Sequence, residues 1–187
     1  MPQSALSKLP PSLHFKKGGE VNTQPYRTLT LTRASPAIGA EVSGIDLTQP
    51  FSDLQIAELH RAFTEHLVLF FRDQPLAPAQ FLDFARAWGK LVEYPFVRGI
   101  EGFPEIIEVK KLEHEKVNFG GVWHSDTTYL DQPPMGTMLV AREVPPYGGD
   151  TLFANQYLAY ETLSDGMKKM LDGLYAISSS SKAEVSR

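Results

Sequence analysis

The sequence predicts a mixed α+β fold, and three patterns along the chain indicate it. Side chains alternate as in a β-strand in residues 26–31 (YRTLTL). Apolar residues then recur at helical spacing in residues 51–66 and 79–89. The region 105–154 is rich in β-forming residues separated by proline and glycine. We therefore expect helices with a few strands first, followed by a largely β region.

The first predicted helix has both a start signal and an apolar stripe. Ser52 is suited to cap it, and Gln55, three residues on, completes a capping box. Ile56, Leu59 and Phe63 fall on one face at helical spacing. This face is expected to pack on the core.

Two further strands and a second helix follow in the sequence. Residues 67–71 (LVLFF) form a short unbroken apolar run, which predicts a strand buried on both faces. In the second helix, Pro78 suits the first turn and Gly89 ends the pattern. Residues 105–112 (EIIEVKKL) predict another strand.

The two ends of the chain differ in character. Residues 155–174 predict a last helix that Asn155 caps and that breaks near 164–166. Residues 1–25 are dominated by proline, serine, lysine and glycine, and we interpret them as a flexible N-terminal leader. Residues 26–187 are expected to form one domain.

Composition narrows the class of function. The 187 residues carry a net charge of −4 with scattered basic residues, which does not favour nucleic acid as a partner. No apolar run reaches the roughly 18–20 residues of a membrane span. The absence of cysteine excludes disulfides, thiolate metal ligands and a cysteine nucleophile, and it fits a reducing, cytoplasmic location.

The stretch GVWHSDTTYL, residues 121–130, contains the strongest chemical signal. His124 and Asp126 are two apart, so on a strand both side chains would point to the same side and could offer nitrogen and oxygen to one metal ion. Two histidines and one carboxylate form the facial triad of non-haem Fe(II) oxygenases. A histidine hydrogen-bonded to a neighbouring residue would give the same three-residue pattern, and this alternative stays open.

The blocks around this pair carry a family resemblance. The ordered blocks are IGAEVSGIDLTQP, LVLFFRDQPLAPAQFLDFARAWGKL, WHSDTTY and PPMGTMLVAREVPPYGGDTLFAN, within about residues 29–174. In this combination the chain resembles the TauD/TfdA family of Fe(II)- and 2-oxoglutarate-dependent dioxygenases. The resemblance implies a double-stranded β-helix (jelly roll, cupin-like) with flanking helices.

The resemblance also implies roles for individual residues. His124 and Asp126 would be the first two iron ligands, and Thr151, in GGDTLF, would help to hold the distal carboxylate of 2-oxoglutarate. With O₂ and 2-oxoglutarate, such an enzyme hydroxylates a small organic substrate and releases succinate and CO₂. A small, anionic substrate of the sulfonate, sulfate ester or aryloxy acid type is expected.

The chain departs from the family pattern downstream of Thr151. The family places its second histidine ligand and its 2-oxoglutarate-binding arginine there, but no histidine follows His124, and Arg142 lies before the threonine. His114 is an alternative ligand, although a solvated loop histidine is favoured. We therefore expect the fold and the metal site to be incomplete in this chain, with the C-terminal part of the domain missing.

Substrate residues are less sharply indicated. Tyr94 and Asn118 are candidates for the pocket wall, and loop residues without substrate contact are an equal alternative. The taurine-using branch has a histidine at the position of Tyr94 and an asparagine at that of Gly120, which argues against taurine as the substrate.

Two functions of other classes stay open at this point. One is a non-catalytic jelly-roll module for binding or assembly, or a truncated inactive dioxygenase. The other is a zinc hydrolase that uses the same His124–Asp126 pair and needs a further ligand. The expected partner is a small molecule, and self-association into a homo-oligomer is neither indicated nor excluded.

Overall fold

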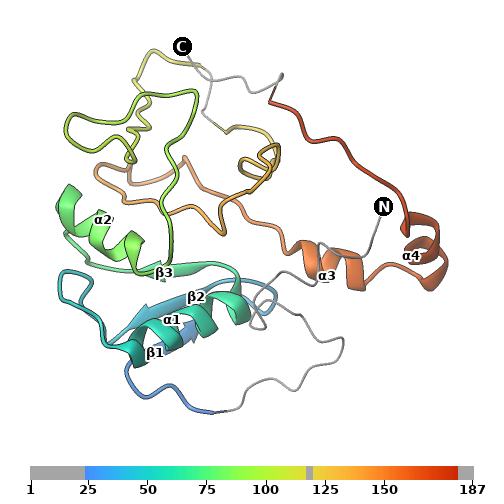
Figure 1. Ribbon diagram of the computed structural model, residues 1–187, viewed down its shortest axis with the longest axis horizontal. Helices are drawn as coiled ribbons and strands as arrows, with labels where there is room; N and C mark the ends of the chain where they lie inside the picture. The colour runs from blue at the N-terminus through green and yellow to red at the C-terminus, as the bar shows by residue number, and fades with distance from the viewer. Residues whose placement is uncertain (1–23, 117–119, 181–187) are drawn as a thin grey trace. The chain divides into compact units, whose positions relative to one another are not determined.

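The computed structural model describes residues 24–116 and 120–180 (Figure 1). The chain divides into two compact units, Met1–Gln74 and Pro75–Arg187. Nearly all of the predicted leader, and the predicted site residue Asn118, lie outside the described residues. The elements in chain order are β1 (Thr30–Arg33), β2 (Ala40–Ser43), α1 (Asp53–His66), β3 (Leu69–Phe71), α2 (Pro78–Arg86), α3 (Gln156–Glu161) and α4 (Asp165–Leu171).

The first unit contains a small mixed sheet with the strand order β1-β2-β3. β1 pairs antiparallel with β2, with Leu31 opposite Val42, and β2 pairs parallel with β3, with Ala40 opposite Leu69. Ala40 and Val42 are buried at 0% and 3% exposure. Figure 1 shows α1 alongside this sheet, and the α+β class predicted from the sequence is confirmed.

Helix α1 begins as predicted. Ser52 Oγ accepts from the N–H of Gln55 at 3.3 Å, and the Gln55 side chain accepts from the N–H of Ser52 at 2.9 Å, so the capping box is present. Leu59 and Ala62 are the most deeply buried hydrophobic residues of the helix, at 2% and 0% exposure. Of the predicted apolar face, Leu59 is buried, whereas Ile56 and Phe63 are half-buried.

The first strand starts later than predicted. Residues 26–28 were expected in a strand, but the N–H groups of Arg27 and Thr28 donate to the carboxylate of Glu58, at 2.7 and 2.9 Å, and the Thr28 hydroxyl donates to it at 2.6 Å. These N–H groups are thus engaged by a side chain of α1. The regular ladder begins only at Thr30.

The strand predicted at 67–71 is shorter and less buried than expected. Leu67 caps α1 in the left-handed conformation, with φ 67°, and its N–H donates to Phe63 O at 2.7 Å, so β3 begins at Leu69. All three residues of β3 are half-buried. The expectation of burial on both faces is wrong because, among the described residues, β3 lies at the edge of the sheet beside β2.

In the second unit, α2 follows the predicted pattern. Pro78 occupies the first turn, and Phe84 is buried with its ring 5.9 Å from that of Trp88 in an edge-to-face contact. The helix ends at Arg86, after which Trp88 N–H donates to Ala85 O at 3.0 Å in a tighter turn.

The β region predicted from 105 to 154 is not observed. Its described residues form turns and extended segments without a strand, and the nearest β-type pairing is a single bridge between Ile100 and Phe103. β propensity alone does not produce a strand, because ladder hydrogen bonds need a neighbouring strand. The residues that the structure describes supply no such neighbour for this segment.

The last helical stretch breaks where predicted. Asn155 Oδ1 accepts from Leu158 N–H at 2.9 Å and caps α3, and Ser164 Oγ accepts from Met167 N–H at 3.3 Å and caps α4. A second N-cap at Ser164 explains the break, since a capping residue leaves the helical conformation.

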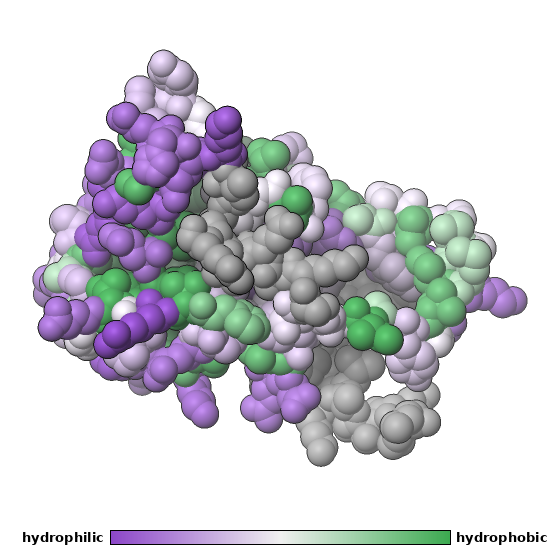
Figure 2. Space-filling view, turned by 90° about the horizontal axis from the view of Figure 1, so that it is seen from above, coloured by the Kyte–Doolittle hydropathy of each residue, from purple (hydrophilic) through white to green (hydrophobic). Residues whose placement is uncertain are grey.

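The buried hydrophobic residues of the described chain all lie between Leu29 and Ala85. Further on, large hydrophobic side chains are exposed, including Trp123 at 70%, Tyr147 at 86% and Ile177 at 95%. Figure 2 shows hydrophobic residues at the surface on the right-hand side, where Figure 1 places α3 and α4. In its described parts the chain has no helix both long and apolar enough for a membrane span.

Candidate metal centre

The predicted pair lies in an irregular segment that leads into a turn. Residues 126–129 form the turn, Leu130 N–H donates to Thr127 O at 3.0 Å, and Thr127 has a φ of 49°. The expected strand geometry is therefore wrong. His124 Nε2 and Asp126 Oδ1 are nevertheless 3.2 Å apart, so the turn brings together the side chains that a strand was expected to align.

The contact of the other ring nitrogen of His124, Nδ1, determines whether the nitrogen that faces Asp126 carries a proton. Nδ1 lies 2.7 Å from the carbonyl oxygen of Val122. A carbonyl oxygen only accepts hydrogen bonds, so Nδ1 carries the proton, and in the neutral ring Nε2 presents a lone pair. Nε2 and the Asp126 carboxylate are then two acceptors in contact, which repel each other unless a proton or a cation lies between them.

Two residues, Thr137 and Gly120, lie next to the side chains of His124 and Asp126. The Thr137 hydroxyl donates to Oδ2 of Asp126 at 2.7 Å. Gly120 has a φ of 68°, and a Cβ at that position would lie 3.1 Å from Cε1 of His124. Glycine thus leaves the space that the imidazole occupies. The side chains of His124 and Asp126 are about half exposed, at 51% and 52%.

The donor set fits a transition metal of the Fe(II) type. Two ligands at a right angle around one ion, each at roughly 2.1 Å, are about 3.0 Å apart, close to the observed separation of the two atoms. Imidazole nitrogen and carboxylate oxygen are the ligand types of non-haem iron sites. Within residues 24–116 and 120–180 there is no group of three metal-binding side chains, so His114 does not complete the set.

An aromatic cluster adjoins the turn. The ring of Tyr94 lies 5.7 Å from that of Phe96, and the ring of Phe96 lies 5.9 Å from that of Tyr129. The hydroxyl oxygens of Tyr129 and Thr127 are buried and have no hydrogen-bond partner among the described residues. Burial, followed by the neighbouring groups of Tyr94 and Asp126, raises the pKa of Tyr129 above 10.0.

Thr151 was predicted to contact 2-oxoglutarate, and this role stays a prediction. Thr151 lies in an exposed, irregular segment after Gly148 and Gly149, whose φ angles are 81° and 70°. None of the hydrogen bonds, ion pairs or ring contacts within the described structure joins Thr151 to His124 or Asp126.

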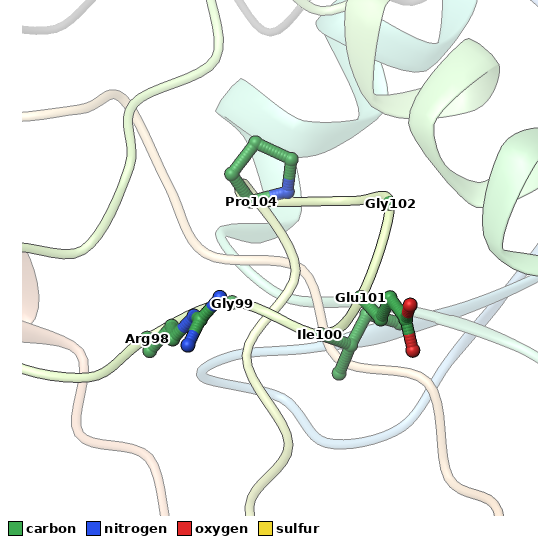
Figure 3. Close-up of a pocket in the computed structure, with 6 residues that line it drawn as sticks. All are labelled: Arg98, Gly99, Ile100, Glu101, Gly102 and Pro104. Carbon is green, nitrogen blue, oxygen red and sulfur yellow. The ribbon is translucent and has the colours of Figure 1, made fainter.

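A surface hollow of about 510 Å³ lies in the loop 98–104 and is separate from these residues (Figure 3). Gly99 permits the tight packing of this loop, because a Cβ there would lie 2.3 Å from the oxygen of Pro104. Figure 3 shows the side chains of Arg98 and Glu101 apart from each other along the loop. Without converging polar groups, it does not resemble a ligand site.

Sequence reasoning missed three contributors to the centre. Thr137 lies eleven residues beyond Asp126, Phe96 lies 28 residues before His124, and the Val122 contact uses a backbone carbonyl. A hydroxyl in a proline- and glycine-rich loop shows no periodicity, and a backbone acceptor leaves no trace in the sequence. Phe96 adjoins the predicted Tyr94, and that proximity was the one available signal.

Comparison with known proteins identifies the chain's relatives. The profile described as "Taurine catabolism dioxygenase TauD, TfdA family" matches residues 28–185. The chain belongs to the TauD/TfdA family. The family resemblance predicted from the sequence is thereby confirmed.

Several known proteins resemble this chain over most of its length. An alkylsulfatase of Acinetobacter baylyi is 35% identical, over 83% of this chain and 48% of its own length. An alpha-ketoglutarate-dependent sulfate ester dioxygenase of Pseudomonas putida is 29% identical, over 76% of this chain and 46% of its own. A solved structure of a taurine dioxygenase from Burkholderia xenovorans matches with a TM-score of 0.63 at 31% identity, over 79% of this chain and 52% of its own. The chain thus spans about half the length of these relatives.

Proposed function

We propose that this chain is the part of an Fe(II)- and 2-oxoglutarate-dependent dioxygenase that carries two iron ligands. The enzyme hydroxylates a small anionic organic molecule and releases succinate and CO₂. Family membership supports the reaction class, and the two named relatives support sulfate esters as the first substrates to test. A sulfonate or an aryloxy acid is the alternative within the same chemistry.

The contact between His124 Nε2 and Asp126 Oδ1 carries the proposal. Nδ1 donates its proton to the Val122 carbonyl, so in the neutral ring two acceptor atoms face each other at 3.2 Å. A divalent cation between them removes the repulsion and uses both lone pairs. When bound, Fe(II) supplies the oxidising chemistry with O₂ and 2-oxoglutarate, and the protein positions and shields the reactants.

The roles of the other site residues are proposed from the family resemblance. Thr151 is proposed to hold the distal carboxylate of 2-oxoglutarate through its hydroxyl, and Tyr94 to line the substrate pocket together with Asn118. For Tyr94, support comes from the ring contacts that link it through Phe96 to Tyr129, three residues after Asp126.

The fold of the whole protein is proposed to be a jelly roll with flanking helices. The match to a family structure at a TM-score of 0.63 supports it. In that fold the exposed hydrophobic side chains between Val122 and Ile177 would be covered by further strands. A cytoplasmic location fits the absence of cysteine.

The test is succinate formation from 2-oxoglutarate by the protein that carries this chain, supplied with Fe(II) and an alkyl sulfate. We expect activity that requires both Fe(II) and 2-oxoglutarate and that His124→Ala abolishes. His114→Ala is the matched control, because His114 lies in an exposed turn, and it should retain activity. Full turnover by His124→Ala would refute the iron-ligand assignment. Loss of activity in His114→Ala alone would move that assignment to His114.

A further inference from the structure

The carboxylate of Asp126 is held from both sides. Oδ1 faces His124 Nε2 at 3.2 Å, and Oδ2 accepts the hydroxyl proton of Thr137 at 2.7 Å. Carboxylate oxygens accept hydrogen bonds, so Thr137 is the donor. A bond of this length to a charged acceptor belongs to the stronger class of hydrogen bonds.

The structure assigns Thr137 the role of a positioning residue for the metal centre. Its hydroxyl occupies Oδ2 and leaves the lone pairs of Oδ1 directed toward Nε2 of His124. This inference rests on the proposed function, because it concerns how Asp126 is presented to the ion. We assign Thr137 a role through Asp126 and not as a ligand of the ion.

The two ligands are arranged in the same way. His124 is oriented by the Val122 carbonyl behind its Nδ1, and Asp126 is oriented by the Thr137 hydroxyl behind its Oδ2. In each side chain, the polar atom that is not the proposed metal ligand thus has one hydrogen-bond partner. Such partners orient metal ligands and typically contribute a factor of 10–100 in metal affinity.

Among the hydroxyl groups near Asp126 in the sequence, Thr137 is the one that donates a hydrogen bond to its carboxylate in the described structure. Ser125, Thr127 and Thr128 are closer to Asp126 in sequence, but among the described residues none of their hydroxyls bonds to it. A half-exposed carboxylate without such a partner can turn about its Cβ–Cγ bond and take water as its donor. The hydrogen bond from Thr137 restricts this rotation. The Asp126 carboxylate is therefore already oriented before the ion binds.

The experiment is calorimetric titration of the complete protein that carries this chain with Mn(II) alone. Thr137→Val keeps the shape of the side chain and removes the hydroxyl, and we expect Mn(II) affinity to fall by a factor of about 10–100. Thr137→Ser restores the hydroxyl and should bind close to wild type. Thr128→Val, which removes an exposed hydroxyl from the same turn, is the matched control and should bind as wild type.

A second measurement separates positioning from folding. The visible spectrum of bound Co(II) responds to the number and arrangement of its ligands. It should change in Thr137→Val while the far-ultraviolet circular dichroism and the melting temperature stay the same. A merely structural role would move the melting temperature and leave the spectrum of bound Co(II) unchanged.

The outcomes distinguish this inference from the function on which it rests. Wild-type Mn(II) affinity in Thr137→Val, or equal loss in the valine and serine variants, would overturn the role of Thr137 and leave the proposed function intact. If the unaltered complete protein and its His124→Ala variant show the same Mn(II) binding, the metal centre is refuted and the role of Thr137 with it.

Discussion

Replacing Glu58 should destabilise the first unit more than any other single carboxylate change in α1. Glu58 is 6% exposed and accepts three hydrogen bonds, from Arg27 N–H, Thr28 N–H and the Thr28 hydroxyl. In Glu58→Ala these donors lose their acceptor. A buried donor without a partner costs about 1–3 kcal/mol. Because the three donors are only partly buried and regain some water, we expect a net loss of ~3 kcal/mol in the free energy of unfolding.

Glu65 provides the matched control. It lies on the same helix, its side chain is 26% exposed, it accepts one hydrogen bond from the Tyr26 hydroxyl at 2.8 Å, and it pairs with Arg61 at 3.8 Å. Exposed pairs of this kind contribute about 0–1 kcal/mol, so Glu65→Ala should cost little. Urea unfolding followed by circular dichroism measures both variants. If Glu58→Ala loses no more stability than Glu65→Ala, the anchoring of residues 27–28 to α1 is not a stabilising feature.

The same carboxylate predicts a pH dependence. Burial raises the pKa of Glu58, but the hydrogen bonds from Thr28 and the N–H of Arg27 outweigh it, so the pKa is lowered from 4.5. The folded state therefore favours the charged form, whose stabilisation is complete above 4.5 and is lost as the pH falls through the lowered value. Glu58→Gln should remove this part of the acid dependence. An unchanged slope of stability against pH in that variant would contradict it.

Three other changes test the site. Gly120→Ala places a Cβ 3.1 Å from the His124 ring at a φ of 68°, so Mn(II) affinity should fall. Unchanged affinity by calorimetry would show that the ring does not need this space. Tyr129→Phe removes a buried hydroxyl that lacks a partner among the described residues, so the melting temperature should stay the same or rise. A decrease of more than about 1 kcal/mol in the free energy of unfolding, measured in urea, would reveal a hydrogen bond to this hydroxyl. Thr151→Val should raise the KM for 2-oxoglutarate of the complete enzyme with a smaller effect on kcat, and an unchanged KM would remove Thr151 from that role.

The elements that the sequence predicted correctly have local causes. The capping box at Ser52 and Gln55 and the caps at Asn155 and Ser164 are interactions between residues three apart, so they can be read from the chain. The apolar faces of α1 and α2 follow from helical spacing in the same way. These caps and apolar faces therefore do not depend on residues far away in the sequence.

The failures arose where structure depends on distant partners. Residues 105–112 have β-forming side chains but no neighbouring strand among the described residues, and Arg27 and Thr28 are bonded by Glu58, about 30 positions away. Neither fact is visible in a short window of sequence. The correct pairing of His124 with Asp126 was predicted for a strand and is achieved by a turn. A spacing of two thus indicated proximity more reliably than it indicated backbone geometry.

Anomalous X-ray scattering from crystals of the complete protein grown with Mn(II) would test the metal centre most directly. We predict a single strong anomalous peak within bonding distance of Nε2 of His124 and Oδ1 of Asp126. The Thr137 hydroxyl should still donate a hydrogen bond to Oδ2. A peak at other residues, or a direct Nε2–Oδ1 hydrogen bond with no ion between the two atoms, would contradict the assignment of this pair as iron ligands.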